Sequence, residues 1–214
     1  MSIHPERITL DQALPSEFVG ELIEFGFVTL PGAVSTGRLA EITSAYDELM
    51  ISGSGPDFRV GSTTTRLYFV DTRLSFEDIY QYPPLLEACK ELISESFKLS
   101  SLLGRTLRAG SPAQDLHVDI PRDSADAPMV GFILMLDPFK EENGATRFVP
   151  GSQNWPDVPS NRLADPRLKW DGEILACGGP RSMIIFNPAV WHGHTANATS
   201  RARRSIQGYF VAVG

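Results

Sequence analysis

The chain has 214 residues, 42% hydrophobic and 21% charged, a balance typical of a soluble globular protein with one sizeable core. Its formal net charge of −7 and its pI near 5.1 argue against nucleic acid or an anionic membrane as the main partner. The beginning of the chain has no signal-like apolar segment, and no apolar run approaches the roughly 18 residues of a membrane span.

The first hundred residues are predicted to be mainly helical, because apolar residues recur there at helical spacing. The three helical segments are 15–26, 36–50 and 83–97. Between the first two, residues 27–32 read FVTLPG and predict a strand closed by a Pro-Gly turn.

After about residue 99, short β-type runs alternate with Gly, Pro, Asn and Asp. The runs are 129–136, 146–151, 173–179, 182–186 and 205–213. This rhythm favours an antiparallel sandwich or barrel, and helices followed by strands predict an α+β fold. We predict a single domain over residues 1–214, with a helical part over about 1–98 and a β-core over about 99–214.

One long connection, residues 153–172, carries three prolines and little periodicity. Such a connection is usually a functional lid or a surface excursion. Trp155 and Trp170 lie near its two ends and either pack or line a pocket.

The two cysteines, Cys89 and Cys177, make neither a disulfide framework nor a zinc-site spacing. Cys89 falls in an apolar helical stripe and Cys177 in a short strand, so both thiols are predicted to be buried. The prediction is a reduced, cytoplasmic protein, and nothing indicates its oligomeric state.

A histidine and an aspartate lie two residues apart in the run AQDLHVDI, residues 113–120. On an extended backbone, His117 and Asp119 would point to the same side. They can form a salt bridge or part of a metal site, and the pair alone does not decide between these alternatives.

Two more histidines, His192 and His194, follow the run SMIIFNPAVW, and the next strand is predicted to begin near Arg203. If these strands are antiparallel neighbours, the arginine returns close to the histidines. Two imidazoles and one carboxylate leave three metal positions open, as in non-haem Fe(II) oxygenases. The far carboxylate of a chelating 2-oxo acid is suited to the planar, permanently charged fork of arginine.

The ordered segments QDLHVDI, ENGATRFVPGSQNW and WHGHTANATSRARR resemble the phytanoyl-CoA dioxygenase family of Fe(II)/2-oxoglutarate oxygenases. FGFVTLPG and the helix after it also resemble that family, so the resemblance spans most of the chain. It implies a double-stranded β-helix, or jelly-roll, core braced by N-terminal helices. It also implies Fe(II), 2-oxoglutarate and O2, with ascorbate as an aid in vitro.

When the family's motifs are matched to this sequence position by position, the resemblance implies that His117, Asp119 and His192 are iron ligands and catalytic residues. Arg203, eleven residues after His192, matches the arginine that binds the C5 carboxylate of 2-oxoglutarate.

A second register, with His194 as ligand and Arg204 as carboxylate partner, has nearly the same spacing. The run Trp-His-Gly followed by Asn197 favours His192.

Five further residues are weaker predictions. Gln114 matches a position from which family members contact the cosubstrate or substrate, although a solvent-facing amide is equally common. Thr146 and Arg147 lie on a strand beside the proposed core, and either Thr146 or Arg147 is predicted to point into it. His194 would share a strand face with His192. Arg66 is a candidate for binding a substrate carboxylate or phosphate, although a surface arginine is the commoner outcome.

The predicted function is hydroxylation of a small-molecule metabolite, with conversion of 2-oxoglutarate to succinate and CO2. Two other classes stay open. One is a non-catalytic metal-binding or sensor domain on the same scaffold, and the other is a zinc-dependent cupin-like hydrolase or isomerase. The sequence identifies neither the substrate nor the outcome, hydroxylation or desaturation. Gln153 replaces a histidine common in the family, outside the predicted ligand set.

Overall fold

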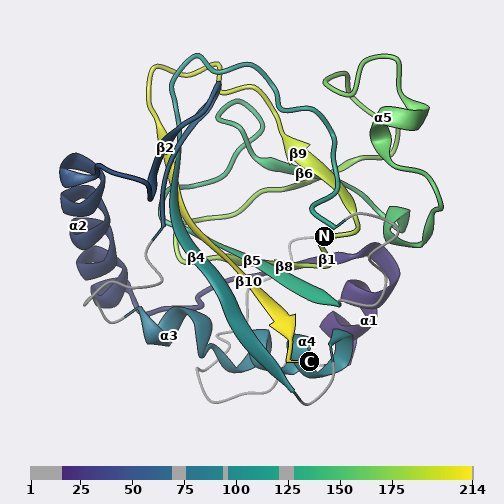
Figure 1. Ribbon diagram of the computed structural model, residues 1–214, viewed down its shortest axis with the longest axis horizontal. Coiled ribbons are helices and arrows are strands. Elements are labelled where there is room, and N and C mark those ends of the chain that lie inside the picture. The colour runs from purple at the N-terminus through teal and green to yellow at the C-terminus, as the bar shows by residue number, and fades with distance from the viewer. Residues whose placement is uncertain (1–15, 69–75, 94–95, 121–127, 214) are drawn as a thin grey trace, which may run out of the picture.

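The computed structural model describes residues 16–68, 76–93, 96–120 and 128–213 (Figure 1). The helices are α1 (Ser16–Phe25), α2 (Thr36–Ser52), α3 (Glu77–Tyr80), α4 (Pro83–Leu92) and α5 (Pro159–Arg162), with a 3-10 turn, η2, at Ser152–Asn154. The strands are β1 (Phe27–Leu30), β2 (Phe58–Val60), β3 (Thr64–Tyr68), β4 (Phe97–Leu107), β5 (Met129–Met135), β6 (Thr146–Val149), β7 (Ile174–Ala176), β8 (Met183–Phe186), β9 (Trp191–His194) and β10 (Arg203–Ala212).

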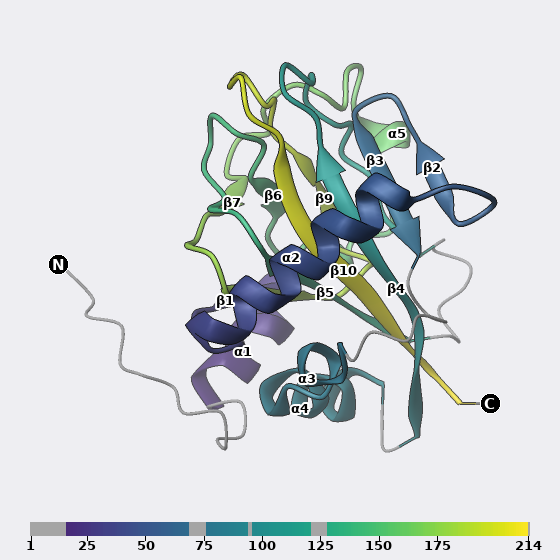
Figure 2. The same ribbon diagram turned by 90° about the vertical axis from the view of Figure 1, so that its left-hand side faces the viewer.

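Two antiparallel sheets form the core. The larger has the strand order β1-β8-β5-β10-β4-β3-β2, and the smaller has the order β7-β6-β9. In Figure 2, α2 crosses one face of the larger sheet and α3 and α4 lie below it, whereas β6, β7 and β9 lie behind. The larger sheet is therefore covered by helices on one face and by the smaller sheet on the other. The predicted α+β class is confirmed.

The neighbouring strands β5 and β8 of the larger sheet are apolar on both faces, as their double covering requires. Along β5, Phe132 and Leu134 pack in the cluster that includes the helices, whereas Ile133 and Met135 pack in the cluster between the sheets. Successive side chains of a strand point to opposite faces, so one short apolar run serves both layers.

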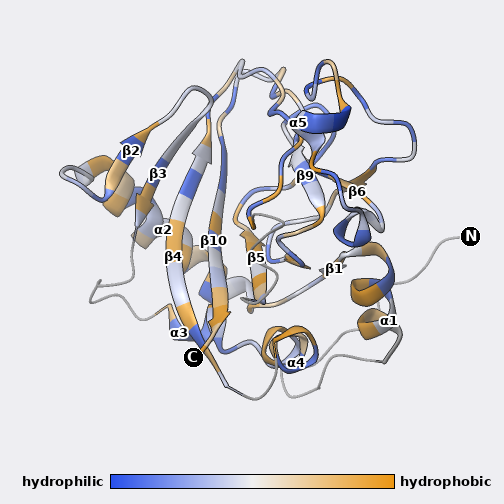
Figure 3. Ribbon diagram, turned by 45° about the vertical axis from the view of Figure 1, so that its right-hand side comes forward, coloured by the Kyte–Doolittle hydropathy of each residue, from blue (hydrophilic) through white to orange (hydrophobic). Residues whose placement is uncertain are grey.

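Local sequence features explain where the helices begin and which of their faces is buried. Ser35 caps α2 by accepting a hydrogen bond from the Arg38 amide (3.2 Å). That helix buries Ile42 and Tyr46 against the sheet, while α4 starts at Pro83, a residue suited to the first helical turn. Figure 3 shows hydrophobic and hydrophilic positions on both α1 and α4, as expected for helices with one buried face.

The first hundred residues contain more sheet than the sequence indicates. β2 and β3 were not expected, and α4 ends at Leu92 instead of continuing to residue 97. Phe97 lies four residues after Ile93, which mimics a helical repeat. In the structure Phe97 begins β4, which pairs with β10 from Ala212 to Arg203. This long-range pairing overrides the local periodicity.

The strands of His192 and Arg203 are not antiparallel neighbours, so the condition on which the sequence placed Arg203 near the histidines is not met. β9 pairs with β6 in the smaller sheet, whereas β10 lies between β5 and β4 in the larger one. Residues 187–190 carry the chain from β8 in one sheet to β9 in the other, so SMIIFNPAVW is not one strand. The two residues meet because both sheets face the same interior.

Cys89 is buried, as predicted, but the prediction for Cys177 was wrong: it is exposed, just after the last residue of the short strand β7. Within the described ranges, no helix has both the length and the apolar character needed to cross a membrane. The cytoplasmic setting stays a prediction.

Candidate metal centre

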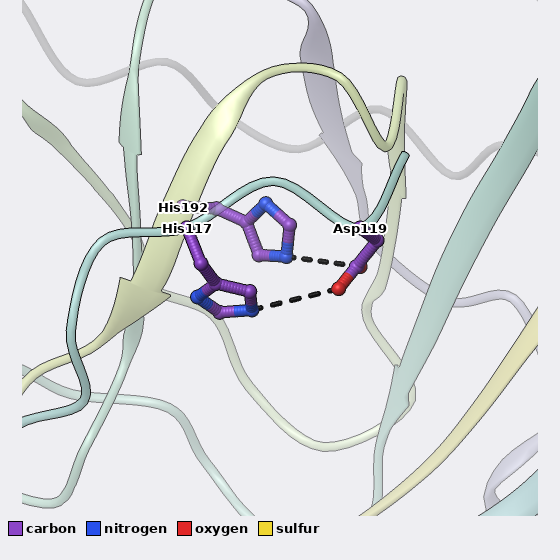
Figure 4. Close-up of side chains that lie close together, drawn as sticks. All are labelled: His117, Asp119 and His192. Carbon is purple, nitrogen blue, oxygen red and sulfur yellow. Dashed lines mark ion pairs between the residues drawn. The ribbon is translucent and has the colours of Figure 1, made fainter. Parts of the chain in front are cut away.

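The side chains of His117, Asp119 and His192 converge beside β9, an edge strand of the smaller sheet (Figure 4). The Nε2 atom of His117 lies 3.5 Å from Oδ1 of Asp119, and the Nε2 atom of His192 lies 3.1 Å from Oδ2. One ligand atom from each residue lies within 4.8 Å of the other two. Two imidazoles and a carboxylate at this spacing could hold a metal ion.

The backbone around these residues explains how they meet. His117 and His192 exchange two backbone hydrogen bonds, of 2.9 and 3.0 Å, and the Asp119 amide donates to the Pro188 carbonyl (2.9 Å). The segment that carries His117 and Asp119 is therefore paired to the start of β9 and to the turn before it. His117 forms an isolated bridge instead of a regular strand, but its side chain still converges with that of Asp119.

Each histidine is oriented by a carbonyl behind it. Nδ1 of His117 lies 2.9 Å from the Asp115 carbonyl, and Nδ1 of His192 lies 2.9 Å from the Val190 carbonyl. A carbonyl oxygen only accepts hydrogen bonds, so the proton belongs on Nδ1. The lone pair of each Nε2 then points toward Asp119, which is the orientation that metal-binding histidines need.

Asp119 is held from its other side by a half-buried tyrosine. The Tyr209 hydroxyl donates to Oδ2 of Asp119 (2.7 Å) and accepts a hydrogen bond from Gln207. Burial, followed by the negative charge of Asp119, raises the pKa of Tyr209 well above its ordinary value, so the hydroxyl remains a donor. Burial opposes ionisation of Asp119, but the facing histidines would, in their protonated form, hold the pKa of its carboxyl well below the usual range. The carboxylate is thus ionised and directed at both imidazoles.

These residues lie at the wall of a cavity of about 290 Å³ between the two sheets. Four polar residues that alternate along β10 line it: Arg203, Ser205, Gln207 and Tyr209. Alternation follows from the period of two in a strand, and the residues between them face the helices or the edge of the core.

Arg203 is the most unusual of these residues, because it is only 3% exposed and forms no ion pair with any described residue. Its guanidinium carbon lies 3.7 Å from the centre of the Phe139 ring. Nε and Nη1 are buried and have no hydrogen-bond partner among the described residues. Burial, with a contribution from nearby Arg105, lowers the pKa of Arg203 to about 9. A buried unpaired cation is costly, so the position fits an anion supplied by a ligand.

The weaker predictions Gln114, Thr146 and His194 also line this cavity. Gln114 accepts a hydrogen bond from Arg105 (3.0 Å) through Oε1, and Thr146 is 6% exposed. Nε2 of His194 lies 3.4 Å from the Thr63 hydroxyl, and burial lowers the pKa of His194 to about 3. His194 is therefore part of the cavity wall, but it lies outside the group of three convergent side chains.

Arg204, the alternative carboxylate partner, faces away from the cavity. It forms ion pairs with Asp47 and Asp137, each at 2.7 Å. Side chains from α2 and from the turn after β5 already neutralise its charge. The structure therefore does not bring Arg204 into one site with His194, as the second register would require.

Arg147, the neighbour of Thr146, is a structural tie. It is 2% exposed and forms a buried ion pair with Glu173 (3.2 Å). Its guanidinium also donates to the carbonyls of Gln114, Pro166 and Leu168 at 2.7–2.8 Å. Arg147 thereby fastens the connection 153–172 to the segment that precedes His117.

That connection is packed onto the core by aromatic rings. Trp155 and Trp170 contact Trp191 with ring centres 5.1 and 5.8 Å apart, and the Arg162 guanidinium lies 4.9 Å from the Trp155 ring. Neither Trp155 nor Trp170 lines the 290 Å³ cavity, so packing is their role.

Several cavity residues were not predicted from the sequence, among them Arg105, Gln207 and Tyr209. Gln207 and Tyr209 share the period-two polar face of Arg203, and that alternation within the run RRSIQGYF was a usable signal. Arg105 carried no such signal, because β4 itself was not predicted.

A family model described as Phytanoyl-CoA dioxygenase (PhyH) matches residues 22–205. Dioxygenase af480 of Aspergillus fumigatus is 24% identical over 200 residues, covering 86% of this chain and 62% of that protein. Multifunctional dioxygenase ausE of Emericella nidulans is 36% identical over 110 residues, covering 47% of this chain and 37% of that protein. The matches to these two relatives span less than two thirds of their lengths.

Solved structures share the fold at low identity. HygX from Streptomyces hygroscopicus, solved with nickel and 2-oxoglutarate bound, has a TM-score of 0.74 at 16% identity, covering 94% of this chain and 88% of that one. The α-ketoglutarate-dependent epimerase SnoN from nogalamycin biosynthesis has a TM-score of 0.72 at 16% identity, with coverages of 92% and 82%. The predicted jelly-roll core is confirmed.

Proposed function

Because the chain belongs to the phytanoyl-CoA dioxygenase (PhyH) family, we propose that it is an Fe(II)- and 2-oxoglutarate-dependent dioxygenase acting on a small molecule. The observation that carries the proposal is one cavity with two features. A His-Asp-His group forms part of its wall, and a buried, unpaired arginine forms another part. A metal needs the first feature and a dicarboxylic cosubstrate needs the second.

In this proposal His117, Asp119 and His192 hold the iron. The donor set fits, because two neutral imidazoles present Nε2 and one carboxylate supplies charge. Bound at this site, iron(II) supplies the capacity to activate O2 for oxidation of a substrate C–H bond while 2-oxoglutarate is converted to succinate and CO2.

Arg203 binds the C5 carboxylate of 2-oxoglutarate. Its buried Nε and Nη1 are donors without partners among the described residues. A carboxylate accepts two parallel hydrogen bonds from one edge of a guanidinium, either Nε with Nη2 or Nη1 with Nη2. Phe139 fixes the plane of the guanidinium from one side. Thr146, Gln114 and His194 complete the polar wall around the cosubstrate.

The remaining wall residues orient the site and limit water. Tyr209 keeps one oxygen of Asp119 engaged, which steadies the carboxylate. Ile133, Phe139 and Phe186 line the same cavity with apolar surface, which protects a reactive centre from bulk water. Hydroxylation of a small-molecule metabolite is the outcome we propose for this site.

The test is O2 consumption and succinate release by the purified protein with Fe(II), 2-oxoglutarate and a panel of small molecules. We expect both signals to require iron and 2-oxoglutarate together, and to vanish in Asp119→Ala. Tight metal and 2-oxoglutarate binding without O2 consumption across the panel would favour a sensor domain. Zinc-dependent hydrolysis or isomerisation without 2-oxoglutarate binding would favour the cupin-like alternative.

A further inference from the structure

Three arginines stand side by side across the strands that form the outer end of the larger sheet. Arg59 of β2 is directly opposite Arg66 of β3, and Arg66 is directly opposite Arg105 of β4. Residues directly opposite in antiparallel strands project from the same face of the sheet. Like charges in that relation destabilise the sheet, so an arginine row calls for a compensating interaction.

The row leads from the cavity of the metal centre to the neighbouring surface. Arg105 lines the inner cavity, Arg66 lines both that cavity and the adjoining one, and Arg59 lines only the adjoining one. The adjoining cavity, of about 810 Å³, also contacts His117, so the two spaces meet at the metal centre.

Arg66 and Arg105 have only neutral hydrogen-bond partners among the described residues. Arg105 donates to the side-chain oxygens of Gln207 (3.3 Å) and Gln114 (3.0 Å), and its Nε is buried without a partner. Arg66 donates to the Thr64 hydroxyl (3.3 Å). Within the described part of the chain, no carboxylate lies at ion-pairing distance from either guanidinium. Burial, followed by the charge of Arg66, lowers the pKa of Arg105 to about 10.

The charges of the cosubstrate complex do not compensate this pair. In the proposed complex, Asp119 and the 2-oxoglutarate dianion are balanced by iron(II) and the guanidinium of Arg203. Arg66 and Arg105 are left as two cations facing the same cavity as the reaction. A substrate anion is the group that completes the balance, and the guanidinium fork suits carboxylates and phosphates.

We propose that the substrate of this enzyme carries an acidic group, a carboxylate or a phosphate, which Arg66 and Arg105 bind beside the metal centre. This inference rests on the proposed function, because the charge balance includes iron and 2-oxoglutarate. Arg59 extends the positive row outward and attracts the anion toward the cavity.

The first experiment measures binding without turnover. The protein is saturated with Mn(II) and 2-oxoglutarate and titrated separately with inorganic phosphate and with benzoate. We expect at least one of the anions to bind, and its affinity to fall at least about tenfold in Arg66→Met and in Arg105→Met. Arg201→Met, which removes an exposed arginine outside both cavities, is the matched control and should bind like the wild type.

The preceding titrations with Mn(II) and 2-oxoglutarate separate two kinds of failure. A wild-type protein that binds neither contradicts the proposed function, and with it this inference. A wild-type protein that binds both but takes up neither anion contradicts the anionic-substrate proposal alone. A tenfold loss of 2-oxoglutarate affinity in Arg66→Met or Arg105→Met also contradicts it, because that arginine then serves the cosubstrate.

The second experiment identifies the acidic group. Succinate release is measured with matched pairs, carboxylic acids with their methyl esters and phosphomonoesters with their parent alcohols. Stimulation by acids but not esters assigns a carboxylate, and stimulation by phosphomonoesters but not alcohols assigns a phosphate. Equal or greater stimulation by the neutral members of both pairs overturns the proposal.

Discussion

Arg147 and Arg203 are both almost fully buried, yet their surroundings differ in every respect that matters for function. Arg147, on β6, has a carboxylate partner in Glu173 and three carbonyl acceptors. Arg203, on β10, has an aromatic ring beside it and two nitrogens that find no hydrogen-bond partner in the described part of the chain. The charge of Arg147 is paired within the chain, although its Nε lacks a hydrogen-bond partner among the described residues, whereas Arg203 forms no ion pair there.

The comparison separates two regions of the interior. Around Arg147, charges are matched by the chain itself, so substitutions there should affect stability. Around Arg203 and the metal centre, charges and hydrogen-bond donors are left for a metal ion or a ligand to pair with, so substitutions there should affect metal or ligand binding.

The largest effect is expected at the metal end of the cavity. His192→Ala should abolish metal binding, because it removes one of three convergent ligand atoms. His194→Ala should keep metal binding, because its Nε2 faces Thr63. Titration with Mn(II), with thermal unfolding of the metal-free proteins as control, distinguishes the variants. The opposite pattern would move the ligand role to His194.

The next effect tests the stability side of the comparison. Arg147→Met should lower the free energy of unfolding by about 3–5 kcal/mol, because Glu173 is left as an uncompensated buried charge. Urea denaturation of the metal-free protein measures it. The double variant Arg147→Met/Glu173→Gln should recover part of the loss. If Arg147→Met lowers the free energy of unfolding by less than about 1 kcal/mol, Arg147 does not hold the connection 153–172 in place.

Arg203→Lys should reduce 2-oxoglutarate affinity at least about tenfold, or about 1.4 kcal/mol, because lysine keeps the charge but loses the planar fork. Mn(II) affinity and stability should hardly change. Isothermal titration of 2-oxoglutarate into the Mn(II)-loaded protein gives the answer.

Arg203→Met provides the complementary control for that prediction. It removes a buried cation that forms no ion pair with the described residues, so the metal-free protein should be as stable as the wild type or more stable. Marked destabilisation by Arg203→Met, with unchanged 2-oxoglutarate affinity in Arg203→Lys, would make Arg203 a structural residue like Arg147.

The smallest effect is expected for Tyr209→Phe, which keeps the ring and removes only the hydroxyl that donates to Asp119. Losing such a partner of a metal-bound carboxylate should weaken metal binding about tenfold. Stability should change by about 1 kcal/mol or less. Mn(II) titration and urea denaturation measure the two quantities, and an unchanged Mn(II) affinity would limit Tyr209 to packing.

Much of the metal centre could be predicted from the sequence, because its geometry is local. His117 and Asp119 are two residues apart, so an extended backbone suffices to point both side chains the same way. The apolar runs 129–136 and 182–186 likewise indicated buried strands through composition alone, and both strands are present. The ordered motifs that resemble the family added His192 and Arg203 at their characteristic separation.

Other features of the fold and the site depend on contacts between segments that are far apart in the sequence, so only the tertiary structure decides them. Phe97 to Leu107 became a strand because β10 and β3 pair with it, and that pairing placed Arg105 in the cavity and Arg66 beside it. Arg203 reached the cavity from the opposite sheet and not from a neighbouring strand. The spacing of residues within a strand specifies the face from which each side chain projects. The register between strands, which packing over the whole core determines, specifies which residues that side chain contacts.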